Sequence, residues 1–167
     1  MRSKCIYLPE NEAERLEVSR NFFGICGFPC VFGALDCTHI PIVSPGGSKA
    51  ELFRNRKVFF SLNVQTLSNA DLYIRNIVAR WPGKFHDSII FEHSSLRAKF
   101  ETVAIPPKYH LVGDNGYGCS TYMLTPFLNP RTQSERRYNY SHIRTQEMLW
   151  RGNMVYGKSA FLACRQT

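Results

Sequence analysis

Residues 33–42, GALDCTHIPI, place an acid and a histidine inside an otherwise apolar segment. Apolar residues lead up to Asp36, and an apolar run resumes after His39. The pattern predicts a buried strand that Asp36 closes, and burying a carboxylate without a partner is costly. No helix-cap or turn signal surrounds Asp36, so we expect it to be paired or bound to a cation.

The segments on either side predict one helix and three strands. Residues 9–29 read as an amphipathic helix that begins near Asn11 and Glu14, with Leu16, Phe22 and Phe23 on its apolar face. The apolar segments within residues 31–44, 58–68 and 72–81 fit three strands in a meander, because the second alternates and turn residues separate it from the third.

The second half of the chain adds helices and one more strand. Residues 86–101 carry apolar side chains at helical spacing, and residues 109–114 form a short apolar strand that ends at Asp114. Residues 129–153 read as a polar loop followed by a basic helix. Without repeats or linkers in the sequence, we expect a single α/β domain over residues 1–167, with a mixed sheet flanked by helices.

Composition indicates an acidic partner. The formal net charge is +8 and the isoelectric point is near 9.4, which favours nucleic acid because lysine and arginine displace counterions from phosphates. A solvated basic face is the alternative. The candidate phosphate contacts are Arg54, Arg56, Lys57, Arg136, Arg137, Arg144 and Arg151.

Cysteine usage and hydropathy narrow the class of protein. The six cysteines contain no C-x-x-C pair, so reduced thiols are favoured over a disulfide framework or a zinc site. No run of about 18 apolar residues is present, so we expect an intracellular protein without a membrane partner.

Three acids are candidates for a metal site. Asp36, Asp87 and Asp114 are too far apart in sequence for a local motif, and meet only if the fold brings strand ends together. Converging carboxylates would bind Mg²⁺ or Mn²⁺. Asp87 also reads as a helix N-cap and Asp114 as a turn former, while His39 and His86 are ligands or, more commonly, structural residues.

Six blocks of the sequence together resemble the transposase-derived nucleases of the PIF/Harbinger group, a branch of the DDE transposases. They are FPCVFGALDCTHIPI, RNRKVFFSLNVQ, WPGKFHDSIIFEHSSL, LVGDNGYG, LTPF and RRYNYSHIRTQ. The resemblance implies an RNase H-like fold and a DNA endonuclease or transposase activity that needs Mg²⁺ or Mn²⁺. It assigns catalytic and metal-binding roles to Asp36 and Asp114 and a supporting metal-ligand role to Asp87.

Departures from the family pattern leave the activity open. The family's glutamate on the last helix aligns with Trp150, and Glu147 lies three residues earlier. Cys37 and Val58 replace family glycines, which strands tolerate. The alternative function is therefore a catalytically inactive, domesticated DNA-binding module.

The same resemblance implies a nuclear location and a separate Myb-like DNA-binding partner. No helix-turn-helix region precedes the domain in this sequence and the last helix reads as shortened, so we expect a domain truncated at both ends.

Overall fold

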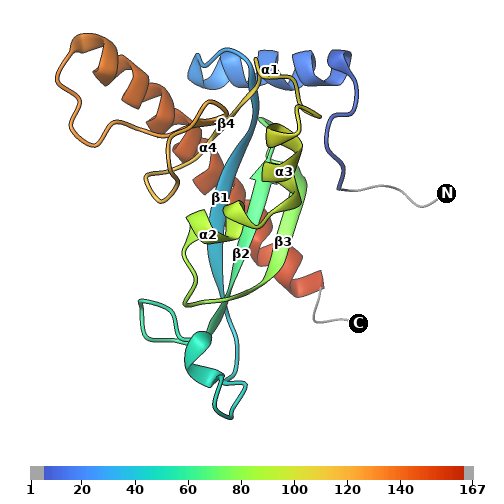
Figure 1. The fold of residues 1–167 in the computed structure, drawn as a ribbon, viewed down its shortest axis with the longest axis vertical. Coiled ribbons are helices and arrows are strands. Elements are labelled where there is room, and N and C mark those ends of the chain that lie inside the picture. The colour runs from blue at the N-terminus through green and yellow to red at the C-terminus, as the bar shows by residue number, and fades with distance from the viewer. Residues whose placement is uncertain (1–5, 164–167) are drawn as a thin grey trace.

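The computed structural model describes the backbone of residues 6–163 and the side chains of residues 6–149. Its centre is a mixed sheet with strand order β3-β2-β1-β4-β5. β1 (Val31–Pro41), β2 (Ser61–Ser68) and β3 (Ile74–Pro82) form an antiparallel meander. β4 (His110–Val112) and β5 (Met123–Leu124) extend the sheet in parallel to β1. The sheet and its flanking helices form an α/β fold that is consistent with an RNase H-like fold (Figure 1).

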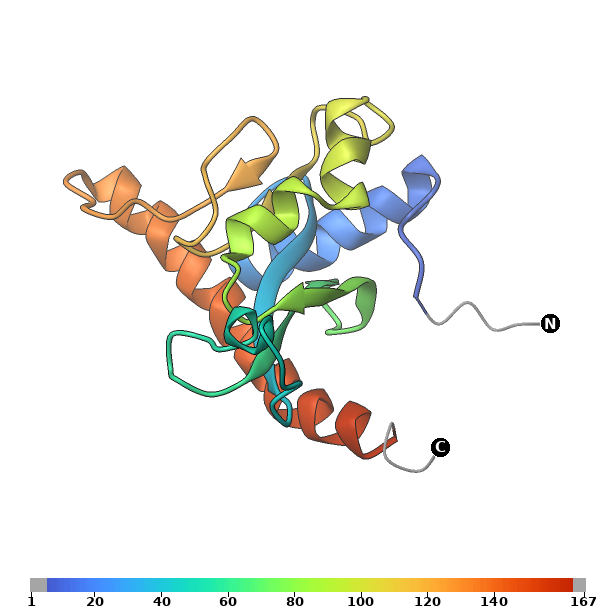
Figure 2. The ribbon, with the colours of Figure 1, turned by 60° about the horizontal axis from the view of Figure 1, so that its bottom comes forward.

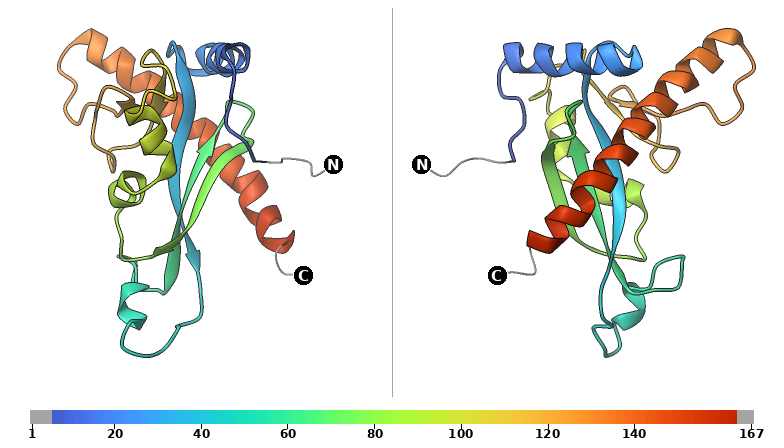
Figure 3. Two further views of the ribbon diagram at one scale, coloured as in Figure 1. Left: turned by 45° about the vertical axis from the view of Figure 1, so that its right-hand side comes forward. Right: turned by 180° about the vertical axis from the view of Figure 1, so that it is seen from behind.

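Helices cover both faces of the sheet. α1 (Glu12–Cys26) and α4 (Gln133–Ala163) lie on one face, and α2 (Asp87–Glu92) and α3 (Ser95–Glu101) lie on the other (Figure 3). Figure 2 shows that the long helix α4 runs alongside the sheet. A single 3₁₀ turn, η1 (Ala50–Leu52), lies in the long connection between β1 and β2.

Two apolar clusters form the core, one on each face of the sheet. The cluster formed where α2 and α3 meet the sheet comprises Phe32, Leu35, Leu67, Phe91, Leu96, Phe100, Ile105, Tyr109, Leu111, Tyr117 and Met123. The cluster formed where α1 and α4 meet the sheet comprises Val18, Phe22, Cys26, Phe28, Val31, Ala34, Ala70, Val112 and Met148. β1 contributes to both clusters because successive side chains of a strand point to opposite faces.

The course of β1 corrects one prediction. Asp36 does not close the strand, since β1 continues to Pro41 by pairing with β2 from Ala34 onward. Pairing of β1 with β4, however, ends at Ala34. Asp36 therefore lies just beyond the end of the pairing with the parallel strand β4, where β1 pairs only with the antiparallel strand β2.

The N-terminal helix begins as predicted but buries a different face. The Asn11 side chain accepts a hydrogen bond from the Glu14 N–H at 2.9 Å, and the Glu14 carboxylate accepts one from the Glu10 N–H. Phe22 is buried, but Leu16 and Phe23 are exposed. The buried residues recur every fourth position at 18, 22 and 26, and position 23 is turned about 100° away from this stripe.

Elsewhere the predicted elements are confirmed, with one further correction. The meander, the helical residues after position 86 and the short strand before Asp114 are all present, whereas β5 was not predicted. Val58 is not in a strand. It lies in a turn held by the Asn55 side chain, with φ of 67°, a backbone conformation in which a β-branched residue is strained.

Candidate active site

Parallel pairing of β1 with β4 brings the first and third candidate acids together. Ala34 pairs with Val112, and Asp36 and Asp114 each follow two residues later. Both acids line one cavity of about 180 Å³. The remaining lining residues are Leu35, Val112, Gly113, Thr145, Gln146 and Leu149.

The turn after β4 directs Asp114 toward Asp87. Asp114 Oδ1 accepts a hydrogen bond from the Gly116 N–H at 2.9 Å, which confirms that this acid forms a turn. A Cβ at Gly116 would lie 3.0 Å from Asp114 Oδ1 and 3.6 Å from Asp87 Oδ2. The missing side chain of Gly116 thus leaves a space that the two carboxylates border.

Asp87 is held from the sheet and is not a helix cap. The N-cap of α2 is His86, and Asp87 is the first helical residue. Asp87 Oδ1 accepts a hydrogen bond from Asn63 Nδ2 at 2.7 Å, and Asn63, fully buried in β2, also donates to the Phe85 carbonyl. The N-cap prediction is wrong because the residue before Asp87 already has the extended backbone of a cap.

Two uncharged side chains, Cys37 of β1 and Tyr117, lie beside the acids. Cys37 Sγ lies 3.2 Å from the Tyr117 hydroxyl. Burial, and next the nearby Asp87 carboxylate, raise the pKa of the Cys37 thiol. Burial also raises the pKa of Tyr117. Both groups therefore stay protonated and form an uncharged wall beside the acids.

The two candidate histidines have structural contacts. A ring nitrogen of His39 lies 3.1 Å from the Ser61 hydroxyl, and burial lowers the pKa of this imidazole. His86 occupies the N-cap position of α2 without a side-chain capping hydrogen bond, and its ring contacts the Arg56 guanidinium.

Helix α4 presents no carboxylate to the cavity among its described side chains. Thr145, Gln146 and Leu149 line it, whereas Glu147 is exposed and does not. The Trp150 side chain lies outside the described residues. The sequence analysis did not predict Gln146 and Asn63 as site residues, because a single amide side chain in a helix or a strand belongs to no recognisable motif.

The donor set fits a hard divalent cation. Asp36 and Asp114 line one cavity, and the oriented Asp87 carboxylate borders the space at Gly116. Oxygen ligands of this kind suit Mg²⁺ and Mn²⁺. Within the described part of the chain, no set of three or more His, Cys, Asp or Glu side chains is already clustered tightly enough to hold an ion.

The predicted phosphate contacts form two separate groups. Arg54 pairs with Glu51 at 2.8 Å and lies over the Phe60 ring, while Arg56 and Lys57 are exposed in the same β1–β2 connection. The second group, on α4, borders a groove with α1 and comprises Arg136, Arg137 and Arg144. The side chain of Arg151 is outside the described residues. The described helices include none long and apolar enough to cross a membrane.

Comparisons with known proteins identify the family of the chain. The sequence pattern of the family described as "DDE superfamily endonuclease" matches residues 35–155. The chain is 33% identical over 147 residues to "Putative nuclease HARBI1" of Rattus norvegicus, and 31% identical over 147 residues to the Homo sapiens protein of that name. Each of these two alignments covers 88% of this chain and 42% of the relative.

A plant relative is more distant. "Protein ALP1-like" of Arabidopsis thaliana is 26% identical over 143 residues, which cover 75% of this chain and 34% of that protein. The chain therefore spans about two fifths of the length of the nuclease-named relatives above. No solved structure matches the chain.

Proposed function

Because the chain belongs to the DDE superfamily endonuclease family, we propose that its carboxylate cavity is a divalent-metal site directed at DNA phosphodiester bonds. The observation that carries this proposal is the parallel pairing of Ala34 with Val112, which places Asp36 and Asp114 side by side in one cavity. Family membership supports a nuclease-type domain, and the nuclease-named relatives support DNA as the substrate class.

Each residue of the site has a distinct role in this proposal. Asp36 and Asp114 would hold Mg²⁺ or Mn²⁺, and Asp87 would be a supporting ligand that Asn63 keeps in one orientation. When bound, such ions activate an attacking water or 3′-hydroxyl and stabilise the leaving oxygen. The protonated Cys37 and Tyr117 side chains add no charge that would compete with the phosphate.

A second candidate function has its own support. Among its described side chains α4 presents the amide of Gln146 to the cavity and no carboxylate, and Glu147 is exposed outside it. The family's glutamate aligns with Trp150. A site with one acid fewer holds a second cation less well. We therefore infer that the unmodified chain cuts DNA poorly and acts mainly as a DNA-binding domain. A nuclear location and a separate Myb-like partner belong to the same proposal and rest on the family resemblance.

A plasmid-nicking assay tests the proposal. The chain is incubated with supercoiled DNA and Mg²⁺ or Mn²⁺, and compared with Trp150→Glu and Gln146→Glu, which add an acid one helical turn apart. We expect little nicking by the unmodified chain and a gain with an added acid, strongest for Trp150→Glu. The gain should disappear when Asp114→Asn is combined with it.

Glu147→Ala is the control on the same helix and should change nothing, because Glu147 is exposed outside the cavity. Robust nicking by the unmodified chain that survives Glu147→Ala would mean that the assignment of α4 positions is wrong. Nicking that survives Asp114→Asn would remove the cavity from the proposal.

A further inference from the structure

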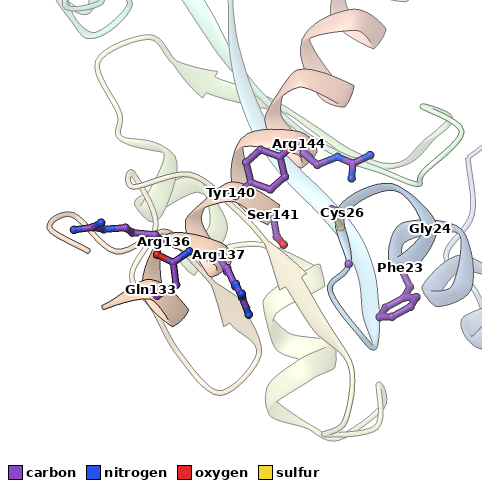
Figure 4. Close-up of a pocket in the computed structure, with 10 residues that line it drawn as sticks. Phe23, Gly24, Cys26, Gln133, Arg136, Arg137, Tyr140, Ser141 and Arg144 are labelled. Atoms are coloured by element: carbon purple, nitrogen blue, oxygen red, sulfur yellow. The ribbon is translucent and has the colours of Figure 1, made fainter. Parts of the chain in front are cut away.

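A basic groove lies between the C-terminal end of α1 and the N-terminal half of α4 (Figure 4). Its volume is about 520 Å³, nearly three times that of the carboxylate cavity at about 180 Å³. The lining residues that matter here are Phe23, Arg136, Arg137, Tyr140 and Arg144. The backbone positions of the three arginines span about 12 Å of the helix axis, since each residue rises 1.5 Å.

The positive charge of the groove is not neutralised within the described residues. No described acid forms an ion pair with Arg136, Arg137 or Arg144. The nearest acid in sequence, Glu135, instead accepts hydrogen bonds from the backbone N–H groups of Arg131 and Thr132. The groove therefore keeps a net attraction for anions, and guanidinium forks suit phosphate oxygens.

Exposed aromatic rings from both helices border the same groove. Tyr140 of α4 is 61% exposed and Phe23 of α1 is 58% exposed. Leaving two large rings in water has no benefit for folding. Aromatic faces beside arginines are the combination that binds unpaired bases and their phosphates, because every base has a flat face that can stack.

The groove and the carboxylate cavity lie on nearly opposite flanks of α4. Each helical residue turns by about 100°. This rotation places Arg137, Ser141 and Arg144 on the flank toward α1, and Gln146 and Leu149 on the other flank. A ligand in the groove therefore does not depend on the acids that would hold metal.

We propose that this groove binds an unpaired strand of nucleic acid, with phosphates on Arg136, Arg137 and Arg144 and bases on Tyr140 and Phe23. A duplex would reach only the arginines, since its base faces are already stacked. The proposal deepens the proposed function by naming single-stranded DNA as a ligand, and rests on it only in taking DNA as the substrate.

Fluorescence anisotropy of a labelled thymidine oligomer tests the proposal with the full chain in EDTA. An oligomer of about 12 nucleotides is within the range of site sizes for such grooves. We expect Tyr140→Ala to weaken binding at least ~5-fold, because stacking contributes about 1–3 kcal/mol per base. Arg144→Ala should lower the slope of log affinity against log salt by ~0.7, the value for one phosphate of a single strand.

Matched variants separate stacking from general charge or misfolding. Tyr73→Ala removes an equally exposed tyrosine, at 59%, from the turn before β3 and should leave binding unchanged. Arg80→Ala removes one charge from β3 and should not match the effect of Arg144→Ala. Tyr140→Phe should bind like the unmodified chain.

Two outcomes would overturn the proposal. One is equal affinity for duplex and single strand together with no effect of Tyr140→Ala. The other is displacement of the oligomer by a polyglutamate peptide when the concentration of its carboxylates is similar to that of the oligomer's phosphates. That result would assign the groove to an acidic protein segment. Asp114→Asn should bind the oligomer with the affinity of the unmodified chain. A chain that fails to nick DNA would therefore leave the groove proposal unaffected. Loss of oligomer binding in Asp114→Asn would contradict the groove proposal.

Discussion

The buried histidine of α4 makes the stability of the domain depend on pH. His142 is 1% exposed and packs against Phe28 and Tyr138, with ring centroids 4.9 and 4.8 Å away. Neither of its ring nitrogens has a hydrogen-bond partner among the described residues. Burial lowers the pKa of His142 from 6.5 to about 4, because the charged imidazolium loses its hydration.

The size of the effect follows from the two pKa values. Between pH 6.5 and pH 4 the unfolded chain binds a proton that the folded chain does not, so the free energy of unfolding rises with pH in this window. The contribution is fully present above pH 6.5 and is lost as the pH falls toward 4. The pKa difference corresponds to about 3 kcal/mol in all, of which about 2 kcal/mol is lost by about pH 5.

Urea denaturation at about pH 7.5 and about pH 5 measures this loss while most carboxylates remain ionised. His142→Leu replaces the imidazole with an apolar side chain of similar size and so removes the titrating group. We expect the unmodified chain to lose about 2 kcal/mol more than the variant between the two pH values. Equal losses in both proteins would refute the assignment of the pH dependence to His142.

The remaining predictions concern strain, packing, capping and charge. Val58→Gly should raise the free energy of unfolding by roughly 0.5–1 kcal/mol, because it relieves the left-handed backbone at φ 67° at some entropic cost; a lower urea midpoint would contradict this. Gly33→Ala should lower it by about 1–3 kcal/mol, since the new Cβ would lie 2.6 Å from Leu67 Cδ1. Asn11→Ala should cost ~1 kcal/mol through loss of the α1 cap, measurable by thermal melting. Duplex affinity should fall with salt by ~0.9 in log–log slope per neutralised phosphate, and a flat dependence would remove the phosphate contacts.

The sequence was sufficient to predict the helices and strands that are determined by residues close together in the chain. Alternation in residues 61–68 and the turn after Ser68 were enough for the meander, and Asn11 with Glu14 for the start of α1. That Asp36 and Asp114 lie near one another was also predicted, because a carboxylate next to an apolar segment needs a partner or a cation to offset the cost of its burial. The reasoning placed Asp36 at the end of its strand, whereas β1 continues to Pro41.

Features that depend on distant partners were missed. The buried face of α1 is chosen by where β1 and α4 lie, so Phe23 is exposed although it is as apolar as Phe22. Asp87 bonds to Asn63, twenty-four residues earlier, and this contact determines its role more than the helix that it begins. Gln146 faces the cavity only because of how α4 crosses the sheet.

The matched register of Asp36 and Asp114 has a consequence for how this domain tolerates mutational drift. The alignment of these acids is set by main-chain pairing of β1 with β4, so substitutions of neighbouring side chains leave it in place. Deleting one residue between Val31 and Asp36 would instead turn the Asp36 carboxylate to the opposite face of the sheet. A single substitution on α4 could add an acid there, whereas a length change in β1 would need a second, compensating length change to realign the acids.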